Sequence, residues 1–153
     1  MPQNGVEILL VEDNPDDVEL AVHALRRENL ANHIEVARDG EEALDFLFCR
    51  GRHTHRSFQA PPRLVLLDLK LPKVDGLEVL KEIKGDPRTK AIPVVIITSS
   101  REEQDLVNGY KLGVNAYIQK PVDFTQFRET VKRLGLFWLV VNQPPPPSAF
   151  QAS

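Results

Sequence analysis

The sequence lacks most of what a secreted or membrane-spanning protein needs. Among its 153 residues Cys49 is the only cysteine, so no internal disulfide can form, and we expect a reducing compartment, the cytoplasm. The sequence contains no run of about 18 apolar residues, so we expect no transmembrane helix. Residues 1–5 lack the basic and apolar regions of a signal peptide. The 19 basic residues are balanced by 22 acidic ones, so no nucleic-acid partner is expected.

Charge is also missing at the carboxyl end, where residues 135–153 contain no Asp, Glu, Lys or Arg. Residues 136–141 are apolar, and prolines occupy 144–147. A helix end that is apolar on every side needs a second cover, which is typical of a protein interface. The prolines favour an extended polyproline segment. The residues expected at the interface are Phe137, Trp138, Val140 and Val141.

What is present is typical of one compact domain, with 42% hydrophobic and 27% charged residues. Short apolar runs alternate with segments of helical periodicity, and the helices are introduced by capping residues such as Asn14 and Asp39. This alternation predicts an α/β fold, a doubly wound, five-stranded parallel sheet of flavodoxin-like (βα)5 type with strand order 2-1-3-4-5. The predicted strands cover residues 6–11, 33–37, 64–67, 93–97 and 116–119.

Polar side chains follow four of the predicted strands. Parallel strands end at one edge of a sheet, so we expect three carboxylates, a hydroxyl and an ammonium group to meet there. Carboxylates repel one another unless a cation neutralises them, and an all-oxygen ligand set selects a hard cation such as Mg²⁺. A carboxylate can accept a phosphoryl group, whose charge a lysine and a hydroxyl would stabilise. These residues are Glu12, Asp13, Asp68, Thr98 and Lys120.

Over residues 6–134 the chain resembles the receiver domain of two-component response regulators, with the single-domain chemotaxis-type receivers as the plainest relatives. Two finer features, the long linker over 50–62 and the pair Phe137-Trp138, are similar to the small response regulators that partner bacterial phytochromes. The motifs that carry the resemblance are Glu12-Asp13, Asp68, Pro72 with Asp75-Gly76, Thr98, and Lys120-Pro121.

The resemblance implies a role for each residue at the metal site. Asp68 would be the phosphoacceptor. Glu12 and Asp13 would form the acidic pair that holds Mg²⁺, with Asp13 as the direct ligand, and the backbone carbonyl of Lys70 would complete the protein ligands.

The resemblance also implies a switch. Thr98 would move toward the phosphoryl group, Lys120 would pair with a phosphoryl oxygen, and Pro121 would follow a cis bond. Tyr117 would rotate inward on activation, although a core tyrosine is an equally good interpretation. Lys70 and Ser100 would tune the lifetime of the phosphoryl group.

The expected function is therefore that of a response regulator in a phosphorelay, phosphorylated by a sensor histidine kinase, a bacterial phytochrome, and dimerising through its carboxyl-terminal helix. It would catalyse only its own phosphorylation and autodephosphorylation. The expected receiver spans 1–141, including an extended last helix, and a proline-rich tail spans 142–153. A helix that ends at Gly135 remains an alternative.

Two other functions stay open as alternatives. One is a receiver-like scaffold that works without phosphorylation. The other is an aspartyl-phosphate phosphatase, which is disfavoured because Lys70 stands where such enzymes carry a second Asp. In the basic linker, His53 and His55 could bind a metal, but a solvated loop is the preferred interpretation.

Overall fold

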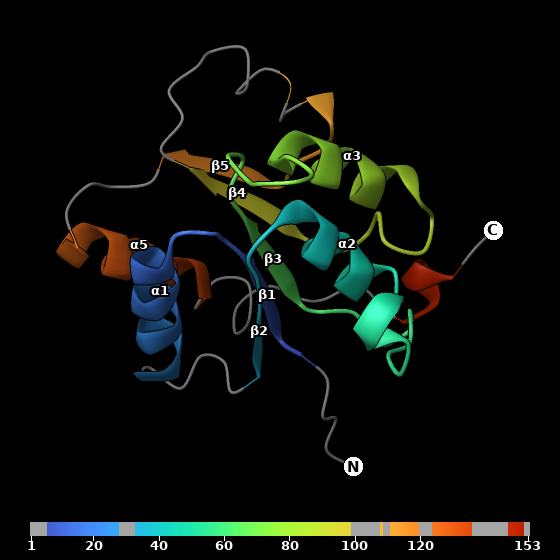
Figure 1. Cartoon of the computed structure of the whole chain (residues 1–153), viewed down its shortest axis with the longest axis horizontal. Coiled ribbons are helices and arrows are strands. Elements are labelled where there is room, and N and C mark those ends of the chain that lie inside the picture. Colours follow the sequence, from blue (N-terminus) through green and yellow to red (C-terminus); the bar gives the residue numbers. More distant parts are fainter. Residues whose placement is uncertain are drawn as a thin grey trace.

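The computed structural model describes residues 6–27, 33–98, 108, 111–119, 124–135 and 147–151, with only the backbone described at 98, 124, 127, 135 and 147. Its centre is a five-stranded parallel sheet in the order β2-β1-β3-β4-β5 (Figure 1), which confirms the predicted topology. The strands are β1 (Ile8–Val11), β2 (Ile34–Ala37), β3 (Leu64–Leu67), β4 (Val94–Thr98) and β5 (Ala116–Gln119).

The helices begin where capping residues satisfy their first backbone N–H groups. The side chain of Asn14 accepts from the N–H of Asp16 at 2.9 Å, and Asp39 accepts from the N–H of Glu42 at 2.8 Å. Such caps are each worth about 1 kcal/mol. The helices are α1 (Pro15–Arg27), α2 (Gly40–Leu47), α3 (Gly76–Gly85) and α5 (Phe124–Gly135), with 3-10 turns η1 (Gly51–His53) and η3 (Pro147–Phe150).

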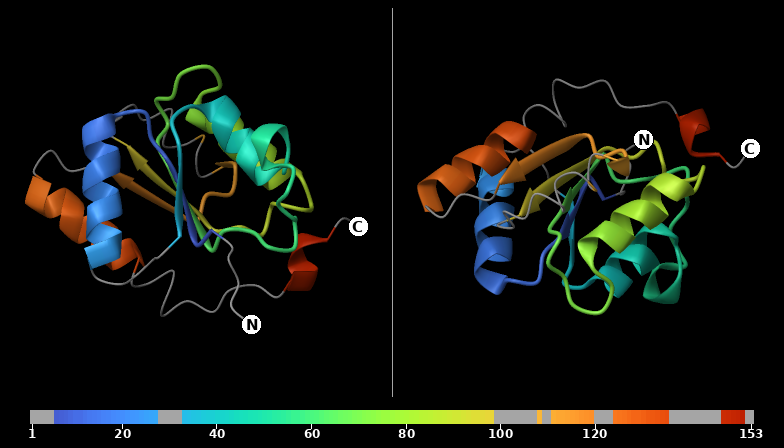
Figure 2. Two further views of the ribbon diagram at one scale, coloured as in Figure 1. Left: turned by 60° about the horizontal axis from the view of Figure 1, so that its bottom comes forward. Right: turned by 90° about the horizontal axis from the view of Figure 1, so that it is seen from above.

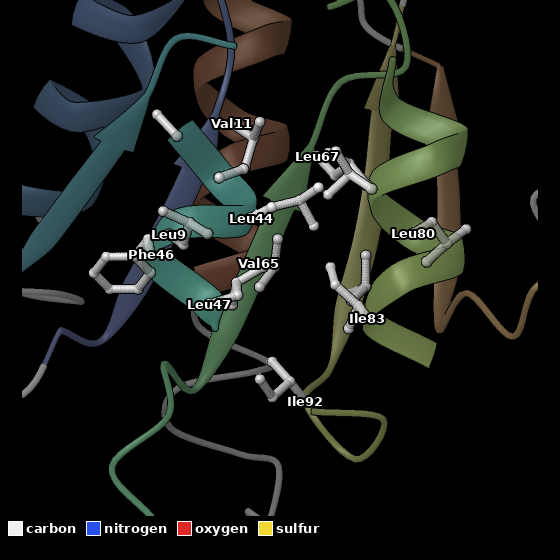
Figure 3. Close-up of a cluster of buried hydrophobic side chains, with 14 of the residues drawn as sticks. Leu9, Val11, Leu44, Phe46, Leu47, Val65, Leu67, Leu80, Ile83 and Ile92 are labelled. Atoms are coloured by element: carbon white, nitrogen blue, oxygen red, sulfur yellow. The ribbon is translucent and has the colours of Figure 1, made fainter. Parts of the chain in front are cut away.

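Helices cover both faces of the sheet, with α1 and α5 on one side and α2 and α3 on the other (Figure 2). Because side chains alternate along a strand, β1 sends Ile8 and Leu10 into the α1/α5 core and Leu9 and Val11 into the α2/α3 core. All four are at most 4% exposed. Figure 3 shows the α2/α3 core, where side chains of the helices and of the sheet interdigitate.

The linker between α2 and β3 is mostly exposed, as expected of a solvated loop, but His53 and Arg56 pack against α2. His53 is 5% exposed and meets the ring of Phe46 edge-on at 5.0 Å between centroids. The guanidinium of Arg56 lies 3.7 Å from the same ring centroid. The pKa of His53 is lowered mainly by burial and also by the nearby charge of Arg52. An arginine can cover an aromatic face while keeping its charge, and so single residues of a mostly exposed basic loop can pack on the core.

The carboxyl-terminal residues return to the domain. Pro147 begins the turn η3, so the predicted extended polyproline segment is wrong at this position. Phe150 is 4% exposed and belongs to the α2/α3 core. Burial of this aromatic ring favours docking of the turn. Residues 136–146, which include Phe137, Trp138, Val140 and Val141, lie outside the described residues, and the predicted domain boundary and dimer interface stay predictions.

Within the part of the chain that the structure describes, no helix combines the length and the apolar character that crossing a bilayer requires.

Candidate functional site

Two acidic residues follow neighbouring central strands at the carboxyl edge of the sheet. In the β1–β3 register Val11 pairs with Leu67, and the N–H of Asp68 donates to the carbonyl of Val11 at 3.0 Å. Glu12 follows Val11 directly. Glu12 and Asp68 are 4% and 5% exposed, so the fold places both carboxyl-bearing residues in largely buried positions.

The loop that follows β3 holds the Asp68 carboxylate. The N–H of Lys70 donates to Asp68 Oδ1 at 2.9 Å, and the N–H of Gly76 donates to the carbonyl of Leu69 at 3.0 Å. A methyl group added at Gly76 would overlap the carbonyl oxygen of Asp68. The loop therefore closes tightly on itself, and a side chain at position 76 would push it open.

Asp13 is exposed and lines a surface hollow of about 380 Å³ beside this loop. The donors predicted for the metal site are the carboxylates of Asp13 and Asp68 and the backbone carbonyl of Lys70. Their chemistry suits a hard cation, because Mg²⁺ in proteins commonly uses one or two carboxylates and keeps waters. Asp13 and Lys70 line the hollow, Asp68 precedes it in the chain, and the ligand set stays a prediction. The lining residues of the hollow are Asp13, Leu69, Lys70, Leu71, Pro72, Asp75 and Leu77.

The three predicted carboxylates are not arranged together as a set of metal ligands in this structure. Among the described residues no group of three or more His, Cys, Asp or Glu side chains is placed to hold a metal ion. Glu12 Oε2 instead accepts from the N–H of Asn14 at 3.1 Å, so this carboxylate also supports the turn into α1. The assignment of Glu12 to the metal site stays a prediction.

The remaining predicted site residues are described only in part. Thr98 ends β4 opposite Gln119 of β5, which places its backbone at the same edge of the sheet. The side chain of Thr98 and all of Ser100, Lys120 and Pro121 lie outside the described residues. Their predicted roles are therefore not tested by the structure.

Tyr117 lies in β5 opposite Ile96. Its side chain is half-buried and packs on the α2/α3 core. This position suits a core tyrosine, and the switch role stays a prediction.

Sequence reasoning missed a contact between this loop and the start of α2. The N–H of Gly40 donates to the carbonyl of Pro72 at 3.3 Å, and Lys73 Nζ lies 3.6 Å from Asp39 Oδ2. The only signal in the sequence is the Asp-Gly pair that opens the helix. From the sequence this pair predicts only a helix cap, because the approach of the loop depends on the three-dimensional fold.

The family model "Response regulator receiver domain" matches residues 8–132 of this chain. The probable methanogenesis regulatory protein FilR2 of Methanothrix harundinacea is 44% identical over 141 residues, which is 92% of this chain and 88% of that protein.

Solved structures of response regulators share the fold. The Mn²⁺-bound form of response regulator Rcp1, a protein of Synechocystis, has a TM-score of 0.85 at 39% identity and covers 92% of this chain and 99% of its own. The phosphorylated cyanobacterial phytochrome response regulator RcpA has a TM-score of 0.86 at 42% identity, with the same coverage. The bacteriophytochrome response regulator AtBRR is 56% identical with a TM-score of 0.71, and covers 93% of this chain and 100% of its own.

Proposed function

The chain belongs to the family of response regulator receiver domains, and we propose that it accepts a phosphoryl group on Asp68 from a sensor histidine kinase with the help of Mg²⁺. One observation carries this assignment. The carboxylate of Asp68 stands at the carboxyl end of a central strand, 5% exposed, and is oriented by the N–H of Lys70 at 2.9 Å. It thus follows β3 at the edge where the acidic residues Glu12 and Asp13 follow β1.

In the proposed reaction a carboxylate oxygen of Asp68 attacks the phosphorus of a phosphohistidine. The P–N bond breaks as the O–P bond of an acyl phosphate forms, and the histidine nitrogen takes up a proton. The N–H of Lys70 fixes the direction of the carboxylate. Mg²⁺, bound by Asp13, Asp68 and the Lys70 carbonyl, would neutralise charge on the transferred group. Thr98 and Lys120 are proposed to contact the phosphoryl oxygens.

A signalling role, rather than turnover of an external substrate, follows from this chemistry. The covalent product stays on the protein until it hydrolyses, so its lifetime sets the duration of the signal. Phosphorylation would shift the balance between two conformations through Thr98 and Tyr117. The phosphorylated state of RcpA supports the proposal for a protein that is 42% identical.

For the partner we propose a kinase of the phytochrome class, located in the cytoplasm. RcpA and AtBRR, at 42% and 56% identity, are both named as phytochrome response regulators. FilR2 at 44% identity is named for methanogenesis, so related receivers are linked to more than one signal. We further propose a homodimer through Phe137, Trp138, Val140 and Val141, supported by the absence of charge over residues 135–153.

Acetyl phosphate, a small phosphoryl donor, tests the assignment without a kinase. The protein is incubated with acetyl phosphate and Mg²⁺, and its intact mass is measured. Wild type should gain one phosphoryl group, whereas Asp68→Asn and a sample with EDTA should gain none. Asp45→Asn is the matched control, because Asp45 lies on α2 in an ion pair with Arg50. Equal modification of Asp68→Asn and wild type would overturn the assignment.

A further inference from the structure

We propose that the first residues of α2, Asp39 and Gly40, position the phosphoacceptor loop (residues 68–75) and thereby set its affinity for Mg²⁺. The inference rests on the proposed function, since it assigns a positioning role at that same site. Neither residue lines the metal-site hollow, and both act through the loop that carries Asp68 and Lys70.

The first support is steric. Gly40 is buried, and a methyl group added there would overlap the carbonyl oxygen of Val74. The same methyl carbon would lie 2.6 Å from the Val74 carbonyl carbon and 2.8 Å from its Cβ. Because the obstacle is mainly backbone, a change of side-chain rotamer cannot relieve it. Any side chain at position 40 must displace either the loop or the helix.

The second support is a hydrogen bond and an ion pair that flank this contact. The N–H of Gly40 donates to the Pro72 carbonyl at 3.3 Å, and the ammonium group of Lys73 lies 3.6 Å from Asp39 Oδ2. The other carboxylate oxygen of Asp39 caps α2 through the N–H of Glu42. One carboxylate therefore fixes the helix start and holds the loop at the same time.

The third support is backbone strain in the loop. Lys73 has φ of 67°, in the left-handed region, which costs a residue with a Cβ atom about 1 kcal/mol. Such a conformation persists where its surroundings fix it, and here the surroundings are the contacts with Asp39 and Gly40. Residues that fix this conformation also fix the path of the chain from Lys70 to Asp75.

These contacts affect the predicted Mg²⁺ affinity because the loop that carries the proposed ligands is short. The carbonyl of Lys70 is the proposed ligand, and its N–H orients Asp68. The N–H of Gly76 closes the far end of the loop by donating to the carbonyl of Leu69, so a shift at Val74 is shared by the short segment that begins at Lys70. Loss of a group that supports metal ligands typically reduces metal affinity about 10-fold or more.

Gly40→Ala tests the proposal, and Gly85→Ala is its matched control. Gly85 is also a helical glycine, but nothing lies within 4 Å of a methyl group added there. Lys73→Ala breaks the exposed ion pair with little risk to folding, and Lys73→Arg retains it. Two quantities are measured on each: the Mg²⁺ concentration for half-maximal phosphorylation by acetyl phosphate, and amide hydrogen exchange of Lys70 and Gly76 in the metal-free protein.

Gly40→Ala should raise the half-maximal Mg²⁺ concentration about 10-fold and speed exchange at Lys70 and Gly76, while exchange in β1 stays unchanged. Lys73→Ala should raise it about 2-fold, because an exposed ion pair contributes little, with recovery in Lys73→Arg. Wild-type values in Gly40→Ala would overturn the positioning role. So would equally accelerated exchange in β1, since that indicates a general loss of stability. A wild type that takes up no phosphoryl group would instead overturn the proposed function.

Discussion

Replacing Arg56 by methionine should destabilise the domain by about 2–3 kcal/mol. The guanidinium stacks on the ring of Phe46 with 3.7 Å between its carbon and the ring centroid. It donates to the carbonyl of Phe46 and to the carbonyl of Ala60 at 3.1 Å. Arg56, in the middle of the linker, thereby bonds both to α2 and to a later residue of the linker.

The magnitude follows from these contacts. A hydrogen bond from a charged group contributes about 1.5–3 kcal/mol when buried, and a cation–π contact about 0.5–2 kcal/mol. Arg56 is only half-buried, so the low end of each range applies: about 1.5 kcal/mol for the part-buried bond to Phe46 and about 0.5 kcal/mol for the cation–π contact. The bond to Ala60 is exposed and adds at most about 1 kcal/mol. Methionine keeps the packing of the aliphatic stem, which limits the loss to the polar head and leads to the total of about 2–3 kcal/mol.

Arg50→Met is the matched control in the same linker. Its guanidinium pairs with Asp45 at 3.1 Å, but the Arg50 side chain is 57% exposed. It also lies farther from an aromatic ring, at 5.5 Å from the centroid of Phe48. An exposed ion pair of this kind contributes about 0.2–1 kcal/mol. The two variants remove the same charge and differ in burial.

Urea unfolding followed by circular dichroism measures both free energies without changing the ionic strength. The account predicts a lower midpoint for Arg56→Met with an unchanged slope, and a nearly unchanged midpoint for Arg50→Met. If the two variants lose stability equally, within about 0.5 kcal/mol, the claim that Arg56 anchors the linker on α2 is refuted.

Two further predictions concern stability. Burial lowers the pKa of Lys84 to about 8, below its value near 10.4 in an unfolded chain. The folded state therefore binds fewer protons between these values, and the free energy of unfolding should rise from about pH 8 to about pH 10 by on the order of 1 kcal/mol. In Lys84→Met this rise should be absent, and its persistence in urea titrations would exclude Lys84 as the cause. Phe150→Ala should lower the free energy of unfolding by about 3–5 kcal/mol, whereas Gln151→Ala at the exposed neighbouring position should change it little. Equal urea midpoints for these two variants would contradict the placement of Phe150 in the core.

The sheet was predictable because its central strands are nearly continuous apolar runs that alternate with helical segments, which is typical of a parallel sheet covered on both faces. The caps Asn14 and Asp39 were predictable because capping depends on residues that are close in sequence. Asp68 was predictable for a related reason. Its position after β3 and the parallel topology together place it at the edge of the sheet where Glu12 and Asp13 follow β1.

Contacts between segments distant in the sequence were not predictable. The place of Arg56 on Phe46 depends on how the linker turns back, and the fit of Gly40 under Val74 depends on the path of another loop. Phe150 follows four prolines, with no periodic pattern around it to indicate a buried side chain. In each case the sequence contains the residue type, but the partner is determined only by the assembled fold.

Phosphotransfer from an autophosphorylated phytochrome-class histidine kinase shows directly whether Asp68 accepts the phosphoryl group. The kinase is labelled on its phosphoryl group, separated from nucleotide and mixed with wild type or Asp68→Asn, with Mg²⁺ or with EDTA. We expect the label to move to wild type only when Mg²⁺ is present, and never to Asp68→Asn. Labelling of Asp68→Asn to the wild-type level would contradict the assignment of Asp68 as the phosphoacceptor.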